Sequence, residues 1–239
     1  MQYSLGVDIG TFDTKAVLVD LDGQIIAQAN KGHKMLVPFP GWAEHRPNQD
    51  WWGDFCETTH SVIAQGQIDV TDIKVVACSA IGPCMLPVDK NGEALMNGVL
   101  YGVDTRAHQE INDLNKEIGA DQILAMGGNA LTSQSVGPKI LWLKRNRPEI
   151  FEKTHKILTS TSFLVHKLTG EYVIDHYTAA NFSPLYDIHN QCWSQTLTAD
   201  LISEEALPDL RWSTDVVGVL SEKAAKETGL PAGIPVTTG

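Results

Sequence analysis

Two apolar, β-branched runs separated by a short polar turn open the chain and constrain its fold more than any other feature. The first run is Leu5 to Ile9, the turn is Gly10 to Lys15, and the second run is Ala16 to Val19. Such runs on either side of a glycine-containing turn predict a β-hairpin. A third extended run, Gln24 to Asn30, follows the turn Asp22-Gly23. We therefore expect a three-stranded antiparallel meander before any helix.

The turn of this hairpin has the chemistry of a phosphate site. Gly10 lets the backbone approach an anion, Thr11 and Thr14 offer hydroxyl donors, and Lys15 offers a positive charge. Asp8, at the strand end, is a carboxylate of the kind that holds Mg²⁺ through water. An ordinary hairpin with a polar turn is the alternative. The Walker A pattern G-x-x-x-x-G-K-[ST] does not occur in the chain.

The composition indicates a globular, acidic protein. At 239 residues with 43% hydrophobic content, the chain can form a real core, as one large domain or two small ones. Its net charge of -11 argues against nucleic acid or an anionic membrane as the main partner. No apolar run approaches the roughly 20 residues of a transmembrane helix, and no basic segment precedes the first strand. We expect a cytoplasmic protein with small-molecule or protein partners, and a homodimer stays open.

Cysteine and histidine spacing predicts no metal centre built from these residues. Cys56, Cys78, Cys84 and Cys192 have no C-x-x-C spacing and lie in or near apolar segments, so we expect reduced, packed thiols. The eight histidines are scattered and show no H-E-x-x-H pattern, which argues against a structural metal.

A helical pattern follows the meander, from Pro47 to about Gln65. Asn48 is its expected N-cap, because an Asn side chain can accept hydrogen bonds from free helix amides. The buried face is expected to consist of Trp51, Phe55, Thr59 and Val62. We expect the tryptophans of this region to pack in the core.

The rest of the chain alternates short extended and helical patterns. The expected elements are a strand at 73–80, a hairpin over 85–101 around the turn 89–92, a helix to about 118 capped by Asp104 or Thr105, helices at 122–126, 139–146, 160–167 (capped by Ser160), 197–206 and 222–227, and extended segments at 156–159 and 234–238. Residues 171–190 are polar and irregular, which indicates a loop region or a short ribbon. This order predicts an α/β layer, a mixed sheet with helices on its faces.

Five blocks in order along the chain resemble the N-terminal domain of the FGGY carbohydrate kinases. They are Gly6 to Thr11 with Lys15; Gly41 to Glu44 with Pro47 and Trp51-Trp52; Val99 to Arg106; Lys139 to Leu143; and Leu168 to Gly170 with Asp175, Tyr177 to Ala180 and Leu185 to Asp187. That family belongs to the actin-like ATPase superfamily. The resemblance therefore implies a ribonuclease-H-like α/β domain, with a mixed sheet and flanking helices, over residues 1–239.

The resemblance also implies a function, namely ATP-dependent phosphorylation of a sugar hydroxyl with ATP and Mg²⁺ as cofactors. Asp8 would orient Mg²⁺, and the nucleotide phosphates would lie on Asp8, Gly10, Thr11, Phe12, Asp13 and Lys15. The sugar would meet Gly82, Pro83, Tyr101, Asp104 and Gln134. The general base, an Asp, is expected about three residues beyond Gly239 by resemblance to the family, and a C-terminal nucleotide-binding domain absent from this chain would hold most of the adenosine site. We therefore expect these residues alone to be an inactive fragment.

Several departures from the family pattern concern the substrate. Gly82-Pro83 falls where xylulose kinases carry a Met-His pair that touches the sugar. Gln134 and Val136 depart from the family signature, and Tyr101 matches the family's Trp only if one residue is inserted. We therefore expect a ketopentose such as xylulose, or a related polyol or aldonate, without a choice among them.

Two alternatives stay open. The same fold serves actin-like filament proteins and heat-shock ATPases, in which nucleotide drives a conformational change and no sugar is phosphorylated. The sugar-side blocks around Trp42, Asp104 and Trp142 favour the kinase, because those relatives are not expected to carry them. The other alternative is a folded domain that binds sugar and ATP poorly.

Overall fold

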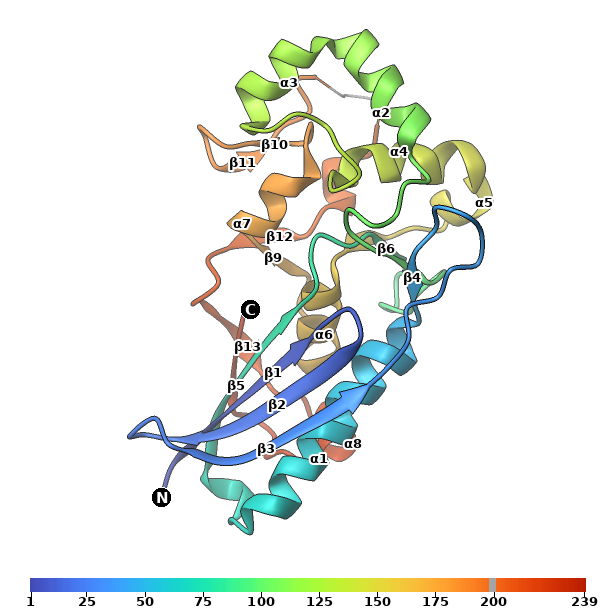
Figure 1. Ribbon diagram of the computed structural model, residues 1–239. Coiled ribbons are helices and arrows are strands. Elements are labelled where there is room, and N and C mark those ends of the chain that lie inside the picture. The colour runs from blue at the N-terminus through green and yellow to red at the C-terminus, as the bar shows by residue number, and fades with distance from the viewer. Residues whose placement is uncertain (198–200) are drawn as a thin grey trace.

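A six-stranded mixed sheet forms the lower half of the molecule (Figure 1). The computed structural model describes residues 1–197 and 201–239. Across the sheet the order is β13 (Val216–Val219), β14 (Pro235–Thr237), β5 (Ile73–Ala80), β1 (Tyr3–Ile9), β2 (Asp13–Asp20) and β3 (Ile25–Gly32). β1, β2 and β3 form the expected antiparallel meander, β5 runs parallel to β1, and β14 runs parallel to β5. The predicted α/β class with a mixed sheet is confirmed.

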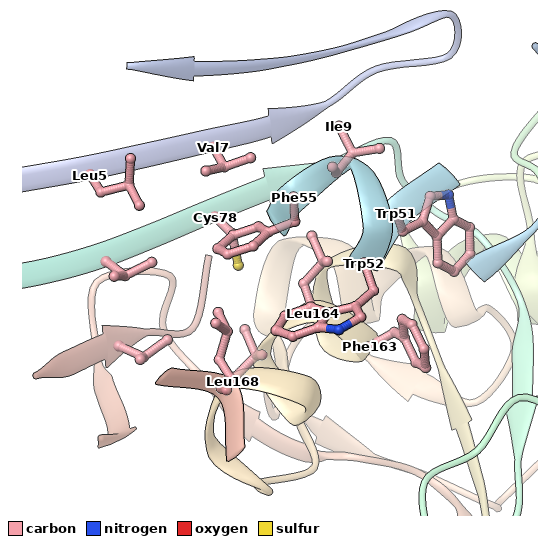
Figure 2. Close-up of a cluster of buried hydrophobic side chains, with 14 of the residues drawn as sticks. Leu5, Val7, Ile9, Trp51, Trp52, Phe55, Cys78, Phe163, Leu164 and Leu168 are labelled. Atoms are coloured by element: carbon pink, nitrogen blue, oxygen red, sulfur yellow. The ribbon is translucent and has the colours of Figure 1, made fainter. Parts of the chain in front are cut away.

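Helices cover one face of this sheet. α1 (Asp54–Gly66) packs on β2 and β3, α6 (Ser160–Thr169) packs on β5 and β14, and α8 (Glu222–Thr228) packs against α1. Leu5, Val7 and Ile9 point from β1 toward Phe55 and Leu164 in this core (Figure 2). Because side chains alternate along a strand, the residues between them must lie on the opposite face.

The segment 47–66 is helical throughout, as expected. It begins with a π-helical turn, Pro47–Gly53, and continues as α1. The predicted face is confirmed, since Trp51, Phe55, Thr59 and Val62 are fully buried. Asn48 as N-cap is wrong: the carboxylate of Asp50 accepts the backbone N–H of Arg46 at 2.8 Å and its guanidinium at 2.6 Å. An ion pair inside the first turn thus replaces the cap.

Short elements form a second layer above the sheet in Figure 1, with a hydrophobic core of their own. They are β4 (Glu44–His45), β6 (Leu86–Val88), β7 (Gly98–Val99), α2 (His108–Leu114), α3 (Ala120–Gly127), α4 (Val136–Asn146), α5 (Pro148–Phe151), β8 (Lys156–Leu158), β9 (Val173–Asp175), α7 (His176–Ala179), β10 (Tyr186–Asp187), β11 (Cys192–Trp193) and β12 (Asp209–Arg211). The strands pair as β4–β7, β6–β8, β9–β12 and β10–β11. Short helical turns lie at Val70–Asp72, Asn115–Gly119, Ala180–Phe182 and Glu204–Ala206.

Several expected boundaries in this layer differ from the structure. The hairpin expected over 85–101 is confirmed, since its turn closes through Asp89 and Glu93 and its arms pair at Val88–Ala94 and Met85–Val99, while Gly98–Val99 also pairs with β4. Thr159, not Ser160, caps α6. The helix expected at 197–206 lies partly outside the described residues, and the described part contains only the turn Glu204–Ala206.

The cysteines are free thiols, three of which fit the expected packing. Cys78 and Cys84 are buried, Cys56 is half-buried, and burial raises the pKa of each of these thiols to about 12. Cys192 is exposed, so the packed position expected for it is wrong. In the described part of the chain, none of the helices is both long and apolar enough to cross a membrane.

A buried guanidinium joins three distant segments of the second layer. Arg106 donates to Asp104 and Glu44, each at 2.8 Å, and its side chain is fully buried. Its guanidinium carbon lies 3.9 Å from the ring centre of Trp42 and 5.0 Å from that of Trp142. Charge pairing and cation–π contacts therefore hold residues of β4, the segment after β7 and α4 together.

Replacing this guanidinium should destabilise the protein strongly. We expect Arg106→Ala to lower the free energy of unfolding by about 3–5 kcal/mol, because Asp104 and Glu44 lose their buried counter-charge. Arg211→Ala, which removes an exposed pair with Asp209, is the control and should cost less than about 1 kcal/mol. Urea unfolding followed by tryptophan fluorescence measures both. Equal losses in the two variants would contradict the role assigned to Arg106.

Candidate active site

The turn between β1 and β2 is tight, and it leaves little room for a side chain at Gly10. The Gly10 N–H donates to the Asp13 carbonyl at 2.7 Å, and a Cβ on Gly10 would lie 3.0 Å from that oxygen. Phe12 is exposed at the tip, with Thr11 beside it. Thr14 is not available to an anion: it is fully buried on the helix-covered face and donates to Asp54 at 3.4 Å. The hydroxyl expected from Thr14 is therefore absent from the site.

Charged side chains of this hairpin converge on the open face of the sheet. Asp8 and Lys15 are cross-strand partners, and both line a cavity of about 640 Å³. Asp8 is exposed and accepts a hydrogen bond of 2.6 Å from Ser79 on β5. Asp13 lies 3.2 Å from Lys15 and also accepts from Asn30, and these two partners hold the pKa of the Asp13 carboxyl below its ordinary value. The exposed face thus carries a free carboxylate beside a cation.

This donor set fits Mg²⁺ held mainly by water and phosphate. Mg²⁺ typically takes one or two carboxylates from the protein and completes its shell with waters and substrate phosphates. Asp8 offers one such carboxylate, exposed and oriented by Ser79. Within residues 1–197 and 201–239, no group of three or more His, Cys, Asp or Glu residues could enclose a metal. The geometry suits an ion that arrives with a phosphate ligand.

A second cavity adjoins the first. It has a volume of about 350 Å³ and is lined by the predicted residues Gly82, Pro83 and Gln134. Ser79, Ser213 and Gly239 line both cavities. The carboxylate-and-lysine face and the Gly82–Pro83 face therefore meet at one junction.

Tyr101 and Gln134 connect the two sides of this region. The Tyr101 hydroxyl is hydrogen-bonded to the Thr11 hydroxyl at 3.1 Å, which joins a residue expected at the sugar to one expected at the phosphates. The Gln134 carbonyl oxygen accepts the Gly102 N–H at 3.0 Å. In the described part of the chain the Gln134 amide nitrogen has no partner, so it remains a free donor beside the second cavity.

Asp104 lies apart from the other predicted sugar residues. It is 1% exposed, and its carboxylate accepts from the Ala43 N–H at 2.6 Å and from Arg106. It lines neither cavity described above. The helix cap expected of Asp104 or Thr105 is also wrong, since α2 begins at His108 without a side-chain cap. The structure thus places Asp104 in the buried cluster around Arg106, away from both cavities.

Comparison with known proteins identifies the family of this chain. The family model described as "FGGY family of carbohydrate kinases, N-terminal domain" matches residues 3–239. The chain belongs to the FGGY family of carbohydrate kinases.

The relatives that this FGGY chain resembles are about twice its length. It is 30% identical over 247 residues to an autoinducer-2 kinase of Klebsiella pneumoniae, with all of this chain and 45% of the relative covered. It is 28% identical to a xylulose kinase of Bacillus subtilis, with 96% of this chain and 46% of the relative covered. The crystal structure of xylulose kinase from Rhodospirillum rubrum superposes with a TM-score of 0.92 at 29% identity, over 99% of this chain and 48% of that one. The chain therefore spans about half the length of the relatives it matches.

Sequence analysis missed several residues around these cavities of the FGGY chain. Ser79 bonds Asp8, and Thr161, Asp175 and Asn181 line the second cavity. Asp175 could have been predicted, because it lies in the fifth block that resembles the family. Ser79 and Thr161 gave no comparable signal, because the sheet register and the chain path bring them to the site.

Lys139, the first residue of the fourth family block, supports the Tyr101 segment from behind. Its ammonium group donates to the carbonyls of Leu100 at 2.6 Å and Tyr101 at 3.1 Å. The side chain is almost fully buried, and this burial lowers the pKa of Lys139 to about 8. An ammonium group whose charged form is disfavoured by burial therefore contacts the backbone of Tyr101, the residue whose hydroxyl is bonded to Thr11.

The lowered pKa of Lys139 predicts how the free energy of unfolding changes with pH. Below pH 8 both states hold the Lys139 proton, and the folded state alone bears the cost of a buried charge. Between about pH 8 and pH 10.5 the unfolded chain binds more protons than the folded one, so the contribution of Lys139 to stability rises with pH. Relative to Lys139→Met, we expect the wild-type free energy of unfolding to gain about 2–3 kcal/mol between pH 7 and pH 10. Urea unfolding of both proteins across this range measures the difference, and a flat difference would contradict the shift.

Proposed function

We propose that the protein transfers the γ-phosphoryl group of ATP to a hydroxyl of a sugar or related polyol. The observation that carries this proposal is the junction of the two cavities at Ser79, Ser213 and Gly239. One cavity offers the Asp8 carboxylate and Lys15, and the other offers uncharged polar groups together with the Asp175 carboxylate. In-line phosphoryl transfer needs positioning and charge stabilisation more than covalent help, and two adjoining subsites provide positioning.

On the phosphate side, Lys15 and the hydroxyl of Thr11 would hold phosphate oxygens beside the backbone of Gly10, Phe12 and Asp13. Asp8 would hold Mg²⁺ through water, with Ser79 fixing the carboxylate. Bound there, Mg²⁺ would neutralise negative charge on the phosphates. Asp13 would keep the Lys15 ammonium at the turn, since the two groups are 3.2 Å apart.

On the sugar side, Gln134 would donate to a substrate hydroxyl from its free amide nitrogen, while Gly82 and Pro83 leave room beside it. We propose that Asp104 contributes indirectly, by holding Arg106 and the segment that carries Tyr101. Its oxygens already accept hydrogen bonds from the Ala43 N–H and from Arg106. The lining residues that the structure describes include no Lys, Arg or His. This favours a neutral ketopentose or polyol over an aldonate, whose carboxylate would lack a cationic partner.

The remaining parts of the proposal come from the family. A general base, an Asp expected about three residues after Gly239 by resemblance, would accept the substrate proton. Gly239 lines both cavities, which is where such a base is needed. A C-terminal nucleotide-binding domain would hold most of the adenosine group.

The relatives narrow the reaction but not the substrate. Their names give an autoinducer-2 kinase and a xylulose kinase, two different acceptors at similar identity. The actin-like or heat-shock type of nucleotide switch has no observation in its favour, because the matching family is one of carbohydrate kinases. The acceptor must therefore be found by assay.

A substrate panel tests the proposed reaction directly. ADP release by the full-length protein is measured in a coupled assay across ketopentoses, polyols and aldonates. We expect a large rate with one neutral sugar or polyol, and a loss of at least about 100-fold in Asp8→Ala, because Mg²⁺ and its phosphate lose their anchor. Asp22→Asn, in the turn between β2 and β3 at the opposite end of β2, should keep the wild-type rate. A rate that is equal with and without every sugar would refute the kinase proposal.

Gln134 provides a test of the sugar subsite alone. With the sugar found in that panel, Gln134→Ala should raise KM for the sugar by about five- to tenfold through the loss of one hydrogen bond, while KM for ATP stays unchanged. Gln109→Ala, on the exposed surface of α2, is the matched control. A KM change for ATP as large as that for the sugar would place Gln134 outside the sugar subsite.

A further inference from the structure

The carbonyl groups of the β1–β2 turn are all engaged from inside the protein. Gly10 donates to the Asp13 carbonyl, and the backbone N–H of His33 donates to the Phe12 carbonyl at 2.9 Å. The side chains of two histidines engage the remaining two carbonyls of the turn. Nε2 of His33 donates to the Gly10 carbonyl at 3.1 Å, and Nε2 of His45 donates to the Thr11 carbonyl at 3.1 Å.

The backbone N–H groups of the same turn are in the opposite situation. In the described part of the chain, the N–H groups of Thr11 and Phe12 have no hydrogen-bond partner. Adjacent peptide N–H groups that are free to point the same way form an anion-binding concavity. Which way they point depends on where the carbonyls of their own peptide units are held, since each peptide unit is planar. The Gly10 carbonyl shares a plane with the Thr11 N–H, and the Thr11 carbonyl shares a plane with the Phe12 N–H.

Each histidine is itself anchored on its other ring nitrogen. Nδ1 of His45 accepts the indole N–H of Trp51 at 3.1 Å, and the His45 ring is fully buried. Burial lowers the pKa of His45 to about 4, so the ring is neutral and its one proton is on Nε2, facing Thr11. The anchor therefore selects the tautomer that can donate to the turn.

His33 is anchored by a carboxylate. Its Nδ1 lies 2.8 Å from Asp54, whose carboxylate also faces Lys31 at 3.4 Å and the hydroxyl of Thr14 at 3.4 Å. Both partners of the ring, the Asp54 carboxylate and the Gly10 carbonyl, only accept hydrogen bonds. Nε2 must carry a proton to donate to the Gly10 carbonyl, and the contact of Nδ1 with Asp54 fixes the orientation of the ring.

We propose that His33 and His45 are positioning residues of the phosphate loop: they hold the Gly10 and Thr11 carbonyls inward, so that the Thr11 and Phe12 N–H groups face the nucleotide phosphates. This inference rests on the proposed function. It adds two residues that touch neither phosphate nor sugar and that act through the peptide units between them and the ligand.

The two amide side chains of the genetic code allow a matched test at each position. The amide nitrogen of Gln lies where Nε2 of His does, whereas the amide group of Asn lies where Nδ1 does. His33→Gln and His45→Gln therefore keep the bond to the turn and lose the anchor. His33→Asn and His45→Asn keep the anchor, to Asp54 and to Trp51 respectively, and lose the bond to the turn.

Binding is read from the turn itself. The full-length protein, labelled with ¹⁵N, is titrated with ATP and Mg²⁺ while the amide signals of Thr11 and Phe12 are followed. We expect these signals to shift in the wild type, and the two Asn variants to bind ATP about five- to tenfold more weakly, the effect of about one hydrogen bond. The two Gln variants should bind within about twofold of the wild type. In each pair, thermal unfolding should show similar losses of stability, and steady-state assays should show the change in KM for ATP but not for the sugar.

Several outcomes would overturn the inference. Equal weakening of ATP binding by Asn and Gln at both positions would show that the histidines act only through stability. ATP binding by the wild type without a response of the Thr11 and Phe12 amides would show that the turn does not hold phosphate, even if a sugar-dependent rate is found. Conversely, an amide response to ATP without any sugar-dependent rate would refute the proposed kinase reaction and leave the role of the histidines intact.

Discussion

The buried ion pairs of Arg106 are the constraint on which the upper layer of the molecule depends. A guanidinium taken out of water is costly unless charged partners and ring faces surround it. Here the partners come from segments far apart in the chain: Glu44 on β4, Asp104 after β7, and Trp142 on α4. Tyr101 lies three residues before Asp104, so the same cluster helps to position the residue whose hydroxyl contacts Thr11 in the β1–β2 turn.

Local patterns predicted every strand of the six-stranded sheet except β13, and they were insufficient for the upper layer. The strands of the meander and β5 have seven or eight residues each, and burial alternates clearly along β1 and most of β2. The strands of the upper layer have two or three residues, too few to show a period. Capping was mispredicted for a related reason. Asp104 is a residue type that commonly caps helices. Its carboxylate instead pairs with the Arg106 guanidinium, a stronger partner than a free helix amide, so this tertiary contact overrides the local capping preference.

The residues of the candidate site likewise divide into those that the sequence predicted and those that only the structure revealed. Asp8, Gly10 and Lys15 belong to one continuous turn, and their chemistry was readable without any structure. Ser79 reaches Asp8 only because β5 lies parallel to β1 with Asp8 opposite Ser79, a register that no local pattern encodes. His33 and His45 were invisible for a further reason: they act on carbonyl oxygens, which every residue has, and leave no mark on the turn's own sequence.

The β1–β2 turn is therefore held by two kinds of contact, one to its carbonyl groups and one to the Thr11 hydroxyl. From below, the two histidines engage carbonyls, which leaves backbone donors facing outward. From the side, the Tyr101 hydroxyl engages the Thr11 hydroxyl at 3.1 Å, and Tyr101 is in turn tied to the Lys139 ammonium through its carbonyl. A hydroxyl can be exchanged between partners by rotation, whereas a carbonyl locked in a planar peptide cannot. The histidine contacts thus hold the backbone of the turn more rigidly than the Tyr101–Thr11 contact, which links the turn to the segment after β7 through two hydroxyls that can rotate.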